Sequence, residues 1–369
     1  MSAAYEFWLT DDAGRKMFLL EDFAFASYSR STRGYGTILF GMPLDSYLPQ
    51  APIIFQPDWR IDVYRSPDYG VLKRRESSYL LRKFRIYDRV DGVRMIEFFG
   101  RSPIDLLRRQ SIQYVADGAT LTGKIDDLMK DLVTGAYVPI ANLYTPGEFS
   151  VESKVALGPT ETITPYGKVL LDVITDLKNT SFGRNSVSTA NRKIYFDVVE
   201  GPGLTNGFGY MFRTYADRRG MDRTKGVVFS AENGNLRQPE YYEDYLDEIT
   251  ACVVNSSVSV QNSDRYLSRW NMITRWKSSV STDASANAAE AAQILSENGK
   301  KISLGAYFLS TPGSPNQPQS LYGVDWDLGD LLPVQYAGKN IQTDVEIVWV
   351  SVNEDGEENI VGSNRVGVV

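Results

Sequence analysis

Carboxylates and tyrosines alternate in one short stretch of the sequence, which makes it the best candidate for carboxylate chemistry. Its five acidic residues and three tyrosines are Glu240, Tyr241, Tyr242, Glu243, Asp244, Tyr245, Asp247 and Glu248. A glycosidase needs one carboxylate on each side of the scissile bond, and one of the two must have a raised pKa. A sequence does not give that separation, so we favour a solvated charged face, or one that pairs with a neighbouring subunit.

The absence of histidine excludes several kinds of active site. The 369 residues contain no histidine and a single cysteine, Cys252. Ser-His-Asp and Cys-His nucleophiles, histidine general bases and His-ligated metal sites are therefore excluded. Cys252 lies in the apolar run 249–254 and cannot form an internal disulfide, so we expect it to be a small core residue.

Metal and phosphate motifs are also incomplete. Asp88, Asp91 and Glu97 lack the regular ligand alternation and the closing glutamate of a calcium loop. Two glycine groups, at 201–203 and 207–209, lack the lysine and hydroxyl residue of a phosphate loop, so we expect turns there. We therefore predict no catalytic, metal-binding or cofactor-binding residues, no cofactor, and a protein that is not an enzyme.

Charge is unevenly distributed along the chain. Acidic residues outnumber basic ones by 46 to 39, which gives a net charge of −7 and argues against a general nucleic-acid-binding surface. The basic runs are Lys73-Arg74-Arg75, Arg82-Lys83, Arg108-Arg109, and Arg218-Arg219 with Arg223. The stretch from Lys73 to Arg89 is suited to an acidic partner protein, although a strand edge protected by charge is the commoner structure. DNA binding is a third alternative, which we disfavour because no nucleic-acid module surrounds the run.

Two distant blocks follow the same plan. The first has strand signals at 59–65, 84–88 and 93–99, with a turn at Asp91-Gly92; the second has them at 331–336 and 345–352, with a turn at Asp355-Gly356 and a return toward Val361. Asp-Gly turns favour hairpins in which both central residues have a positive φ. Each block predicts part of a small antiparallel barrel or sandwich. Two similar barrels per chain suit a ring in which the number of similar barrels, and so the apparent symmetry, is twice the number of copies.

The remaining signals predict further strands and short helices. Strands are expected at 5–9, 16–20, 37–42, 193–199, 210–215, 226–230 and 249–260, with loops at 43–57 and 310–320. Apolar residues recur at helical spacing in 125–133, in 169–177 after Thr164-Pro165, and in 288–295. A short helix is expected after Ser102-Pro103, with Ser102 as its cap and Arg101, Arg108 and Arg109 around it.

These elements predict a mainly β protein with short helices (α+β), which contains two related antiparallel β-barrel-like domains plus helical insertions. We assign residues 1–135 to the first barrel-like domain with packing helices, and 136–191 to an irregular connector and helix. Residues 192–369 form the second barrel-like domain, with an Ala-rich helical insertion. With 43% hydrophobic residues, the chain can bury real cores. No apolar stretch approaches eighteen residues, and the N-terminus lacks the features of a signal peptide, so we expect a soluble protein made in the cytoplasm.

Several motifs resemble one family of viral proteins. They are Trp59-Arg60-Ile61-Asp62-Val63-Tyr64-Arg65, the strand-to-helix segment Gly100-Arg101-Ser102-Pro103-Ile104-Asp105-Leu106-Leu107-Arg108-Arg109, Asp222-Arg223-Thr224, the segment 227–236, and Asp327-Leu328-Gly329-Asp330. In this order they resemble the siphophage tail hub, or baseplate hub, proteins of long-tailed bacteriophages. The resemblance covers most of the chain and is weaker in the first forty residues and the Ala-rich segment.

The resemblance implies a structural protein of the virion, assembled in the host cytoplasm. Three copies would form a ring that joins the sixfold tail tube to the tail tip or fibres and lines the DNA exit channel. The implied partners are two further copies, the tail tube or distal tail protein ring, tail-tip or fibre proteins and the tape-measure protein. DNA would only pass through, and no membrane anchor is expected. Because the sequence stops soon after the second block, we also expect no fused lysin domain.

Two alternatives to the hub remain open from the residues. Six tryptophans and 22 tyrosines suit a tail-tip adhesion or carbohydrate-binding protein, since aromatic faces stack on sugars. A small carboxylate-based hydrolase is the other. For the hub itself, the acidic excess predicts a neutral to acidic channel wall, past which phosphates slide. The basic residues Lys73, Arg74, Arg75, Arg82 and Lys83 are then expected to face protein neighbours.

Overall fold

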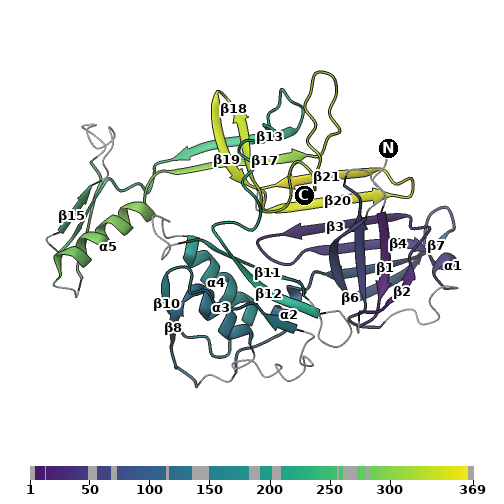
Figure 1. The fold of residues 1–369 in the computed structure, drawn as a ribbon, viewed down its shortest axis with the longest axis horizontal. Coiled ribbons are helices and arrows are strands. Elements are labelled where there is room, and N and C mark those ends of the chain that lie inside the picture. Colours follow the sequence, from purple (N-terminus) through teal and green to yellow (C-terminus); the bar gives the residue numbers. More distant parts are fainter. Residues whose placement is uncertain are drawn as a thin grey trace.

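The computed structural model describes most of the chain, and its largest element is one open β-sheet (Figure 1). The described residues are 5–12, 14–48, 56–67, 73–113, 116–134, 149–182, 192–201, 209–255, 257–260, 272–279 and 283–364. In spatial order the eleven strands of the sheet are β13 (Leu236–Asp244), β17 (Lys301–Leu309), β21 (Glu358–Ser363), β20 (Ile347–Asn353), β3 (Phe25–Ser31), β4 (Thr37–Pro43), β7 (Arg94–Arg101), β6 (Arg74–Asp88), β5 (Arg60–Arg65), β1 (Tyr5–Thr10) and β2 (Lys16–Leu19). The mainly β prediction is confirmed.

Neighbouring strands of this sheet all pair antiparallel, and they come from both halves of the chain. β3 pairs with β20, so that Ser29 lies opposite Trp349. The described strands do not close into a barrel, and the two barrel-like domains stay a prediction.

One hydrophobic core runs along the sheet. Side chains of a strand point alternately to its two faces. In β20, Val348, Val350 and Val352 are accordingly buried, whereas Ser351 between them is exposed. The core continues through β4, β5 and β7 and reaches Trp326 in the loop before β18 (Leu331–Tyr336), which pairs with β19 (Lys339–Asp344). This core therefore joins residues from both ends of the described chain.

The two predicted Asp-Gly hairpins are present, with a different turn from the one expected. Gly92 and Gly356 have φ of +84° and +74°, but neither preceding aspartate has a positive φ. The N–H of Gly92 donates to the carbonyl of Arg89 at 2.9 Å, and that of Gly356 donates to the carbonyl of Asn353 at 3.0 Å. Only the glycine is left-handed, because the turn is longer than two residues and its αL position lies at the end.

A second body, here called the helical body, comprises the described residues between 104 and 216. Its elements are α2 (Asp105–Arg108), β8 (Leu121–Lys124), α3 (Ile125–Val133), β9 (Phe149–Val151), β10 (Thr160–Ile163), α4 (Leu170–Phe182), β11 (Ile194–Gly201) and β12 (Gly209–Ala216). The predicted apolar faces of α3 and α4 are buried in a core of their own. α4 begins later than Thr164-Pro165 suggests, because Lys168 closes a turn onto Pro165 and Val169 makes a β-bridge with Ser111.

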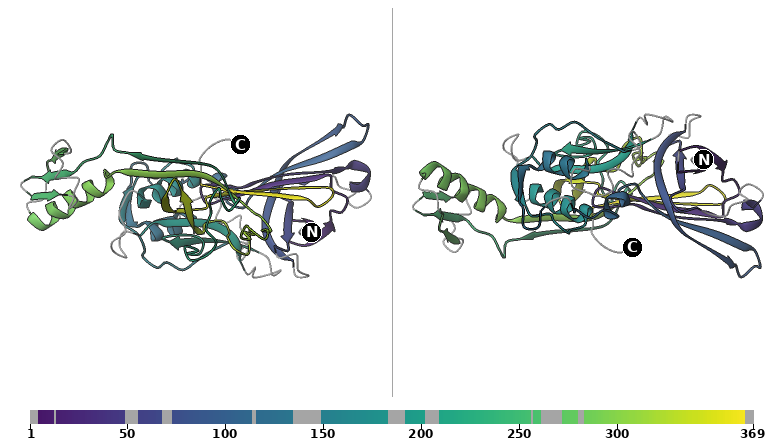
Figure 2. Two further views of the ribbon diagram at one scale, coloured as in Figure 1. Left: turned by 90° about the horizontal axis from the view of Figure 1, so that it is seen from above. Right: turned by 90° about the horizontal axis from the view of Figure 1, so that it is seen from below.

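A third body, here called the outer unit, stands at the end of the ribbon formed by β13 and β17 (Figures 1 and 2). It contains β14 (Ala251–Val254), β15 (Ser257–Val260), β16 (Thr274–Lys277) and α5 (Ala284–Glu297). The prediction of one long strand over 249–260 is wrong. The chain turns at Asn255, whose φ is +53°, and β15 pairs back on β14. Cys252 is buried there, as expected.

Three further sequence predictions need correction. Residues 226–230 form no strand, since only Phe229 makes an isolated bridge, to Val334. The loop predicted at 43–57 begins with a short helix, α1 (Leu44–Tyr47), and its residues 49–55 lie outside the described ones. Ser102 does not cap α2, because its Oγ accepts the N–H of Gly36 at 2.9 Å.

The hydrophobic cores of the described residues are grouped differently from the ranges 1–135, 136–191 and 192–369, and the domain ranges stay a prediction. The core of the sheet takes residues from Phe7 to Ile360, and that of the helical body from Ile104 to Phe212. The physical reason is that strand pairing here joins segments far apart in sequence. The helical body is an excursion of the chain between β7 and the later strands of the sheet.

Candidate interaction site between the sheet and the helical body

The acidic stretch singled out from the sequence does not form a catalytic pair. Glu243 lies on β13, where it accepts hydrogen bonds from Tyr241, Tyr245 and Lys339, the last at 2.7 Å. The Lys339 ammonium and the two tyrosine hydroxyls lower the pKa of Glu243 to about 2. A carboxyl group with that pKa cannot hold the proton that a general acid must donate at neutral pH.

The other members of the stretch point to different surroundings. Asp247 is exposed and lies 3.5 Å from the Lys301 ammonium, whereas Glu248 is buried at the base of the outer unit. Asp244 accepts the N–H of Leu246 at 2.9 Å. The structure therefore spreads these carboxylates along a strand and the turn after it, and does not gather them around a cavity.

The three acidic residues considered for calcium are each paired with an arginine of the β6–β7 hairpin. Asp88 pairs with Arg94, Asp91 with Arg89, and Glu97 with Arg85. Among the described residues, no group of three or more His, Cys, Asp or Glu side chains could hold a metal ion. The glycine groups at 201–203 and 207–209 lie for the most part outside the described residues.

The basic runs are largely neutralised by carboxylates of the same chain. Lys73 pairs with Glu6 at 2.7 Å, and Arg82 with Asp58 at 3.1 Å. The Lys83 ammonium lies 5.0 Å from the centre of the Phe99 ring. The stretch from Lys73 to Arg89 is thus a strand edge and hairpin with internal ion pairs, which leaves little free positive charge for DNA.

One carboxylate binds all three arginines that lie around α2 in the sequence. Asp105 is 1% exposed and accepts hydrogen bonds from Arg101, Arg108 and Arg109 at 2.8 to 3.1 Å. Burial opposes its ionisation, but the three guanidinium groups hold the pKa of Asp105 below its ordinary value. Arg109 also donates to Asp58 at 2.7 Å, just before β5. This cluster fixes the chain where it leaves the sheet for the helical body.

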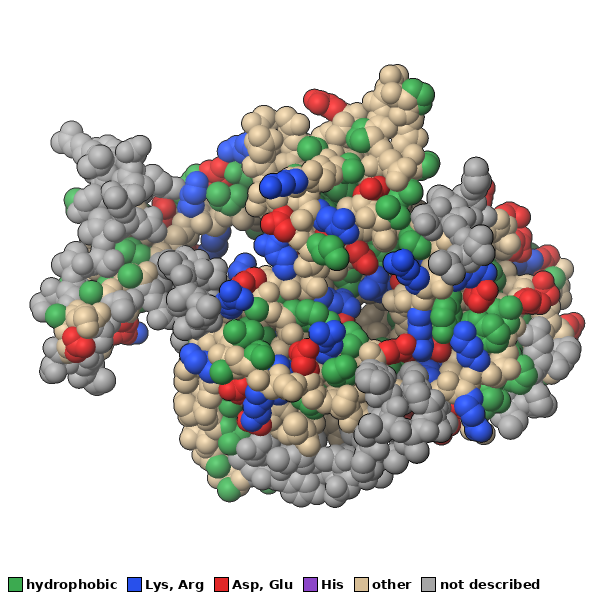
Figure 3. Space-filling view, in the orientation of Figure 1, with side chains coloured by type: hydrophobic (Ala, Val, Ile, Leu, Met, Phe, Trp, Pro, Cys, Tyr) green, Lys and Arg blue, Asp and Glu red, His purple; other side chains and the backbone are tan. Residues whose placement is uncertain are grey.

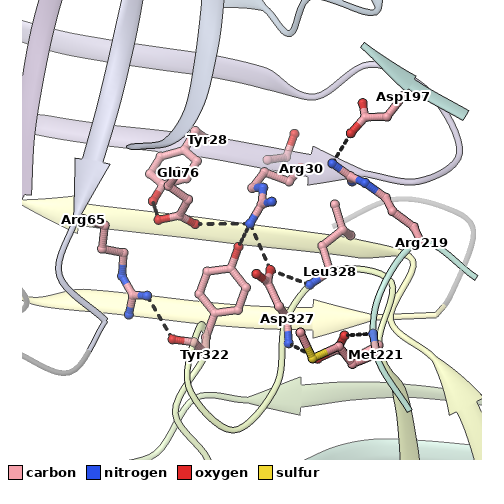
Figure 4. Close-up of polar contacts among 12 residues, drawn as sticks. Tyr28, Arg30, Arg65, Glu76, Asp197, Arg219, Met221, Tyr322, Asp327 and Leu328 are labelled. Atoms are coloured by element: carbon pink, nitrogen blue, oxygen red, sulfur yellow. Dashed lines mark hydrogen bonds and ion pairs between the residues drawn. The ribbon is translucent and has the colours of Figure 1, made fainter. Parts of the chain in front are cut away.

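A larger polar network lies where β3, β6 and the loop before β18 meet (Figure 4). Arg30 is its centre: its Nη1 donates to the Tyr322 hydroxyl and, at 2.9 Å, to the Asp327 carboxylate. Glu76 lies 3.8 Å from the same nitrogen and accepts a hydrogen bond from the Tyr28 hydroxyl at 3.0 Å. These contacts tie the loop of residues 321–330 to the middle of the sheet.

A second arginine, Arg65 on β5, extends the network to β1 and β21. Arg65 Nη1 donates to the Tyr322 carbonyl at 3.0 Å, and its Nη2 donates to Glu358 at 3.1 Å. The Tyr5 hydroxyl donates to the same Glu358 at 2.6 Å. β1, β5, β21 and the loop before β18 are therefore held together by one guanidinium group.

The charges of this network are fixed at neutral pH. Burial disfavours the cation of Arg30, but Tyr322, Asp327 and Glu76 raise its pKa well above the ordinary value. Burial, with the negative charge of Glu76, also raises the pKa of Tyr28. The tyrosine hydroxyls therefore stay protonated and donate, while the carboxylates accept.

A polar cavity of about 240 Å³ opens beside this network, between the sheet and the helical body. β3 and β6 line one side, and residues 197–200 of β11 line the other. Arg75 on β6 forms ion pairs with Asp62 of the sheet and with Glu200 of β11, so it bridges the two bodies. Arg219 pairs with Asp197 on the far side. Figure 3 shows basic and acidic side chains mixed around the hollow in this face.

Sequence reasoning missed this junction as a site. Arg30 and Tyr322 are separated by 292 positions, and no local pattern links them. One signal was available: the motif Asp327-Leu328-Gly329-Asp330, singled out for its resemblance to tail proteins, contributes Asp327 to the network and Asp330, which accepts the N–H of Met221 at 2.5 Å. The arrangement joins the sheet, the loop before β18 and the helical body through paired charges.

No family model and no curated protein matches the chain. Solved structures do. The tail protein from Neisseria meningitidis matches with a TM-score of 0.52 and 12% identity over 98% of this chain and 96% of that chain. The 43 kDa tail protein of prophage MuSo2 from Shewanella oneidensis matches with a TM-score of 0.51 and 13% identity over 97% of both chains.

A chain of the PdpA–VgrG complex also matches, with a TM-score of 0.50 and 10% identity over 100% of this chain and 66% of that one. The first two matches cover nearly the whole of both proteins. The resemblance to phage tail proteins is thus confirmed at the level of the fold: this chain has the fold of the tail proteins of Neisseria meningitidis and of a Shewanella prophage.

Proposed function

We propose that this chain is a structural tail hub protein of a tailed bacteriophage. Three copies form a ring that joins the tail tube to the tail tip or fibres and lines the DNA exit channel. The observation that carries the proposal is the similarity of fold to two tail proteins over nearly the full length of each. The motif order in the sequence, which resembles hub proteins, supports the more specific role.

The symmetry of the sheet supports a ring of three. The β6–β7 and β20–β21 hairpins lie on either side of the β3–β4 pair, and their turns have the same hydrogen bonds. In the proposed ring, each hairpin belongs to one of the two barrel-like repeats. A threefold ring with two related surfaces per copy presents six related surfaces to a sixfold tube.

A non-enzymatic role fits the state of the carboxylates. The candidates Glu243, Asp88, Asp91 and Glu97 are each paired with a lysine or arginine of the described chain. The pairing lowers the pKa of Glu243, Asp91 and Glu97 and removes these three groups from general acid chemistry. The proposed protein is therefore a scaffold that needs no cofactor.

The proposed location is the virion tail tip, with assembly in the host cytoplasm. The partners are two further copies, the tail tube or distal tail protein ring, tail-tip or fibre proteins and the tape-measure protein. DNA is in transit only. No helix of the described residues is long and apolar enough to span a membrane.

Ion pairs within the chain support a channel wall that is neutral to acidic. Lys73, Arg75 and Arg82 each pair with a carboxylate of the chain itself. In the proposed ring these residues, with Arg74 and Lys83, face protein neighbours, and the lumen is neutral to acidic. Five basic side chains in the lumen would instead indicate a surface that grips DNA.

The test is the copy number and position of the chain in an assembled tail. Mass measurement of the purified chain, alone and with its tube partner, should give three copies per ring. Image averaging of tail tips without imposed symmetry should place one such ring between tube and tip. Six copies per ring, or a chain located only on peripheral fibres, would refute the hub.

A tail-tip adhesion or carbohydrate-binding role is the second candidate. It is favoured by two exposed aromatic side chains, Trp276 on the outer unit and Tyr242 on the ribbon, which are 66% and 53% exposed. Aromatic faces of this kind stack on sugars. Binding to a glycan array that is lost in Trp276→Ala would support adhesion. Binding that is absent, while the ring forms, leaves the hub as the function.

A further inference from the structure

The helical body and the sheet are separate in their packing. Their hydrophobic cores share no buried residue: one extends from Phe7 to Ile360 through the sheet, the other from Ile104 to Phe212. Two bodies with separate cores and a polar interface move relative to each other unless that interface is large and apolar. The nature of their contacts therefore decides whether they form a rigid unit.

Most of those contacts are polar, and Tyr35 of the β3–β4 loop adds an apolar one by packing on the core of the helical body. Arg75 of β6 pairs with Glu200 of β11, and Lys178 of α4 donates to the carbonyl of Thr32 at 2.7 Å. Arg60 Nη1 lies 3.4 Å from the Tyr210 hydroxyl. The cavity of about 240 Å³ lies between β6 and β11, so the two faces are not packed against each other there. Beside the cavity, the ion pair of Arg75 with Glu200 is partly open to solvent, and such pairs contribute little free energy compared with an interdigitated core.

The described chain crosses between the bodies at two places of different stiffness. At the first, Asp105 clamps Arg101, Arg108 and Arg109. The second follows β12, where Asp217 has a φ of +69°, a conformation that costs a non-glycine residue free energy. Gly220 then lies against Asp330 so closely that a Cβ would be 2.3 Å from its carboxylate. The first crossing is fixed, the second has a strained residue, and Gly220 after it is anchored, which together describe a hinge at Ala216 to Arg218.

We propose that the helical body is hinged on the sheet at residues 216–218, and that two ion pairs act as a latch that holds it closed over the cavity. The latch pairs are Arg75 with Glu200 and Arg219 with Asp197. Both carboxylates belong to β11, which lines the cavity, and both arginines belong to the sheet side. Opening moves β11 away from β6 and widens the cavity, while both cores stay intact.

Removing the latch charges tests the hinge. In the variant Glu200→Gln/Asp197→Asn, Arg75 keeps its ion pair with Asp62, and Arg219 is partly exposed. The control is Arg213→Gln, which removes an ion pair with Glu152 inside the helical body; the Arg213 side chain is 42% exposed, and Glu152 keeps its contact with Lys130 of α3 at 3.8 Å. Amide hydrogen exchange of the full-length chain is followed in β6 and β11 beside the cavity, and in α3 as a reference for the core.

We expect the latch variant to exchange at least tenfold faster in β6 and β11 beside the cavity, with α3 unchanged, and the control to match the parent chain. Raising the salt concentration in the parent chain should shift the same amides in the same direction, since it screens the ion pairs. Unchanged exchange beside the cavity would overturn the hinge. Faster exchange in α3 as well would also overturn it, because it would show loss of the whole core.

Discussion

The helical body and the outer unit are both excursions of the chain from one sheet, yet they differ in how they hold together. The helical body has eighteen described residues in its buried core and docks on the sheet through polar contacts. The outer unit has five described residues in its core and stands at the end of a two-stranded ribbon. The helical body therefore folds together with the sheet, whereas the outer unit is attached to the sheet only through the ribbon. We expect perturbations of equal chemistry to have unequal effects in the two.

The largest difference should come from the same leucine truncation in each core. Leu132 in α3 is fully buried, and Leu132→Ala should lower the free energy of unfolding by roughly 2–5 kcal/mol. Leu295→Ala in α5 should leave the main urea transition unchanged and affect only the exchange of the outer unit. Equal shifts of the main transition would show that the outer unit folds cooperatively with the sheet, as the helical body does.

Alkaline pH should affect the joint of the helical body. Burial lowers the pKa of Lys178 from 10.5 to about 8, with Arg33 acting in the same direction and Glu346 against it. Between these pKa values the unfolded chain binds more protons than the folded one, so the free energy of unfolding rises with pH. The slope should reach at most about 1.4 kcal/mol per pH unit.

The measurement is urea unfolding between pH 8 and 9.5, since the buried tyrosines titrate above that window. Lys178→Met should flatten the rise. Lys154→Met is the control, because Lys154 is 48% exposed in its ion pair with Asp131. A rise of equal slope in Lys178→Met would contradict the assignment.

Deleting the outer unit should affect the rest of the chain little. Asp244 and Lys301 are paired residues at the end of the ribbon, so an Asn-Gly turn can join them in place of residues 245–300. The melting temperature of the remaining body should change by no more than about 2 °C, which corresponds to less than about 1 kcal/mol. Aggregation or a large loss of stability on deletion would make the outer unit a structural part of the sheet.

The smallest effect is expected at the acidic stretch on the ribbon that carries the outer unit. Glu243→Gln removes an ion pair with Lys339 that is open to solvent, and exposed pairs contribute little to stability. Thermal unfolding should be unchanged, and neither the parent chain nor Asp247→Asn should cleave peptidoglycan. A purified chain with hydrolytic turnover that disappears in Glu243→Gln would contradict the structural role.

Patterns of neighbouring residues predicted the helices of the helical body and of the outer unit better than they predicted where the chain turns and how the elements pair. The apolar spacing of α3 and the Ala-rich α5 can be read from neighbouring residues, and both helices are where they were expected. The break at Asn255 was missed, although Asn255-Ser256-Ser257 interrupts the apolar run with residues that favour turns and asparagine adopts a positive φ more readily than most residues.

The joint was beyond sequence reasoning for a different reason. The basic run from Lys73 to Arg75 was recognised, but its partners Glu6, Asp62 and Glu200 are spread over the chain. Pairing of β3 with β20 depends on the free energy of the whole sheet, and periodicity gives only which side of a strand is buried. The fold class was therefore predictable, while the grouping of strands was not.

The pairing of β3 with β20 also sets when the protein can fold. Ser29 has its partner Trp349 only after some 320 further residues have been made, which takes tens of seconds at a translation rate of roughly 5–20 residues per second. During that time one edge of β3 has no strand beside it, and such edges promote aggregation. Completion of the sheet is therefore late and slow, since contacts of this sequence separation close late. A chaperone that shields this edge should raise the yield of soluble protein more than a stronger promoter does.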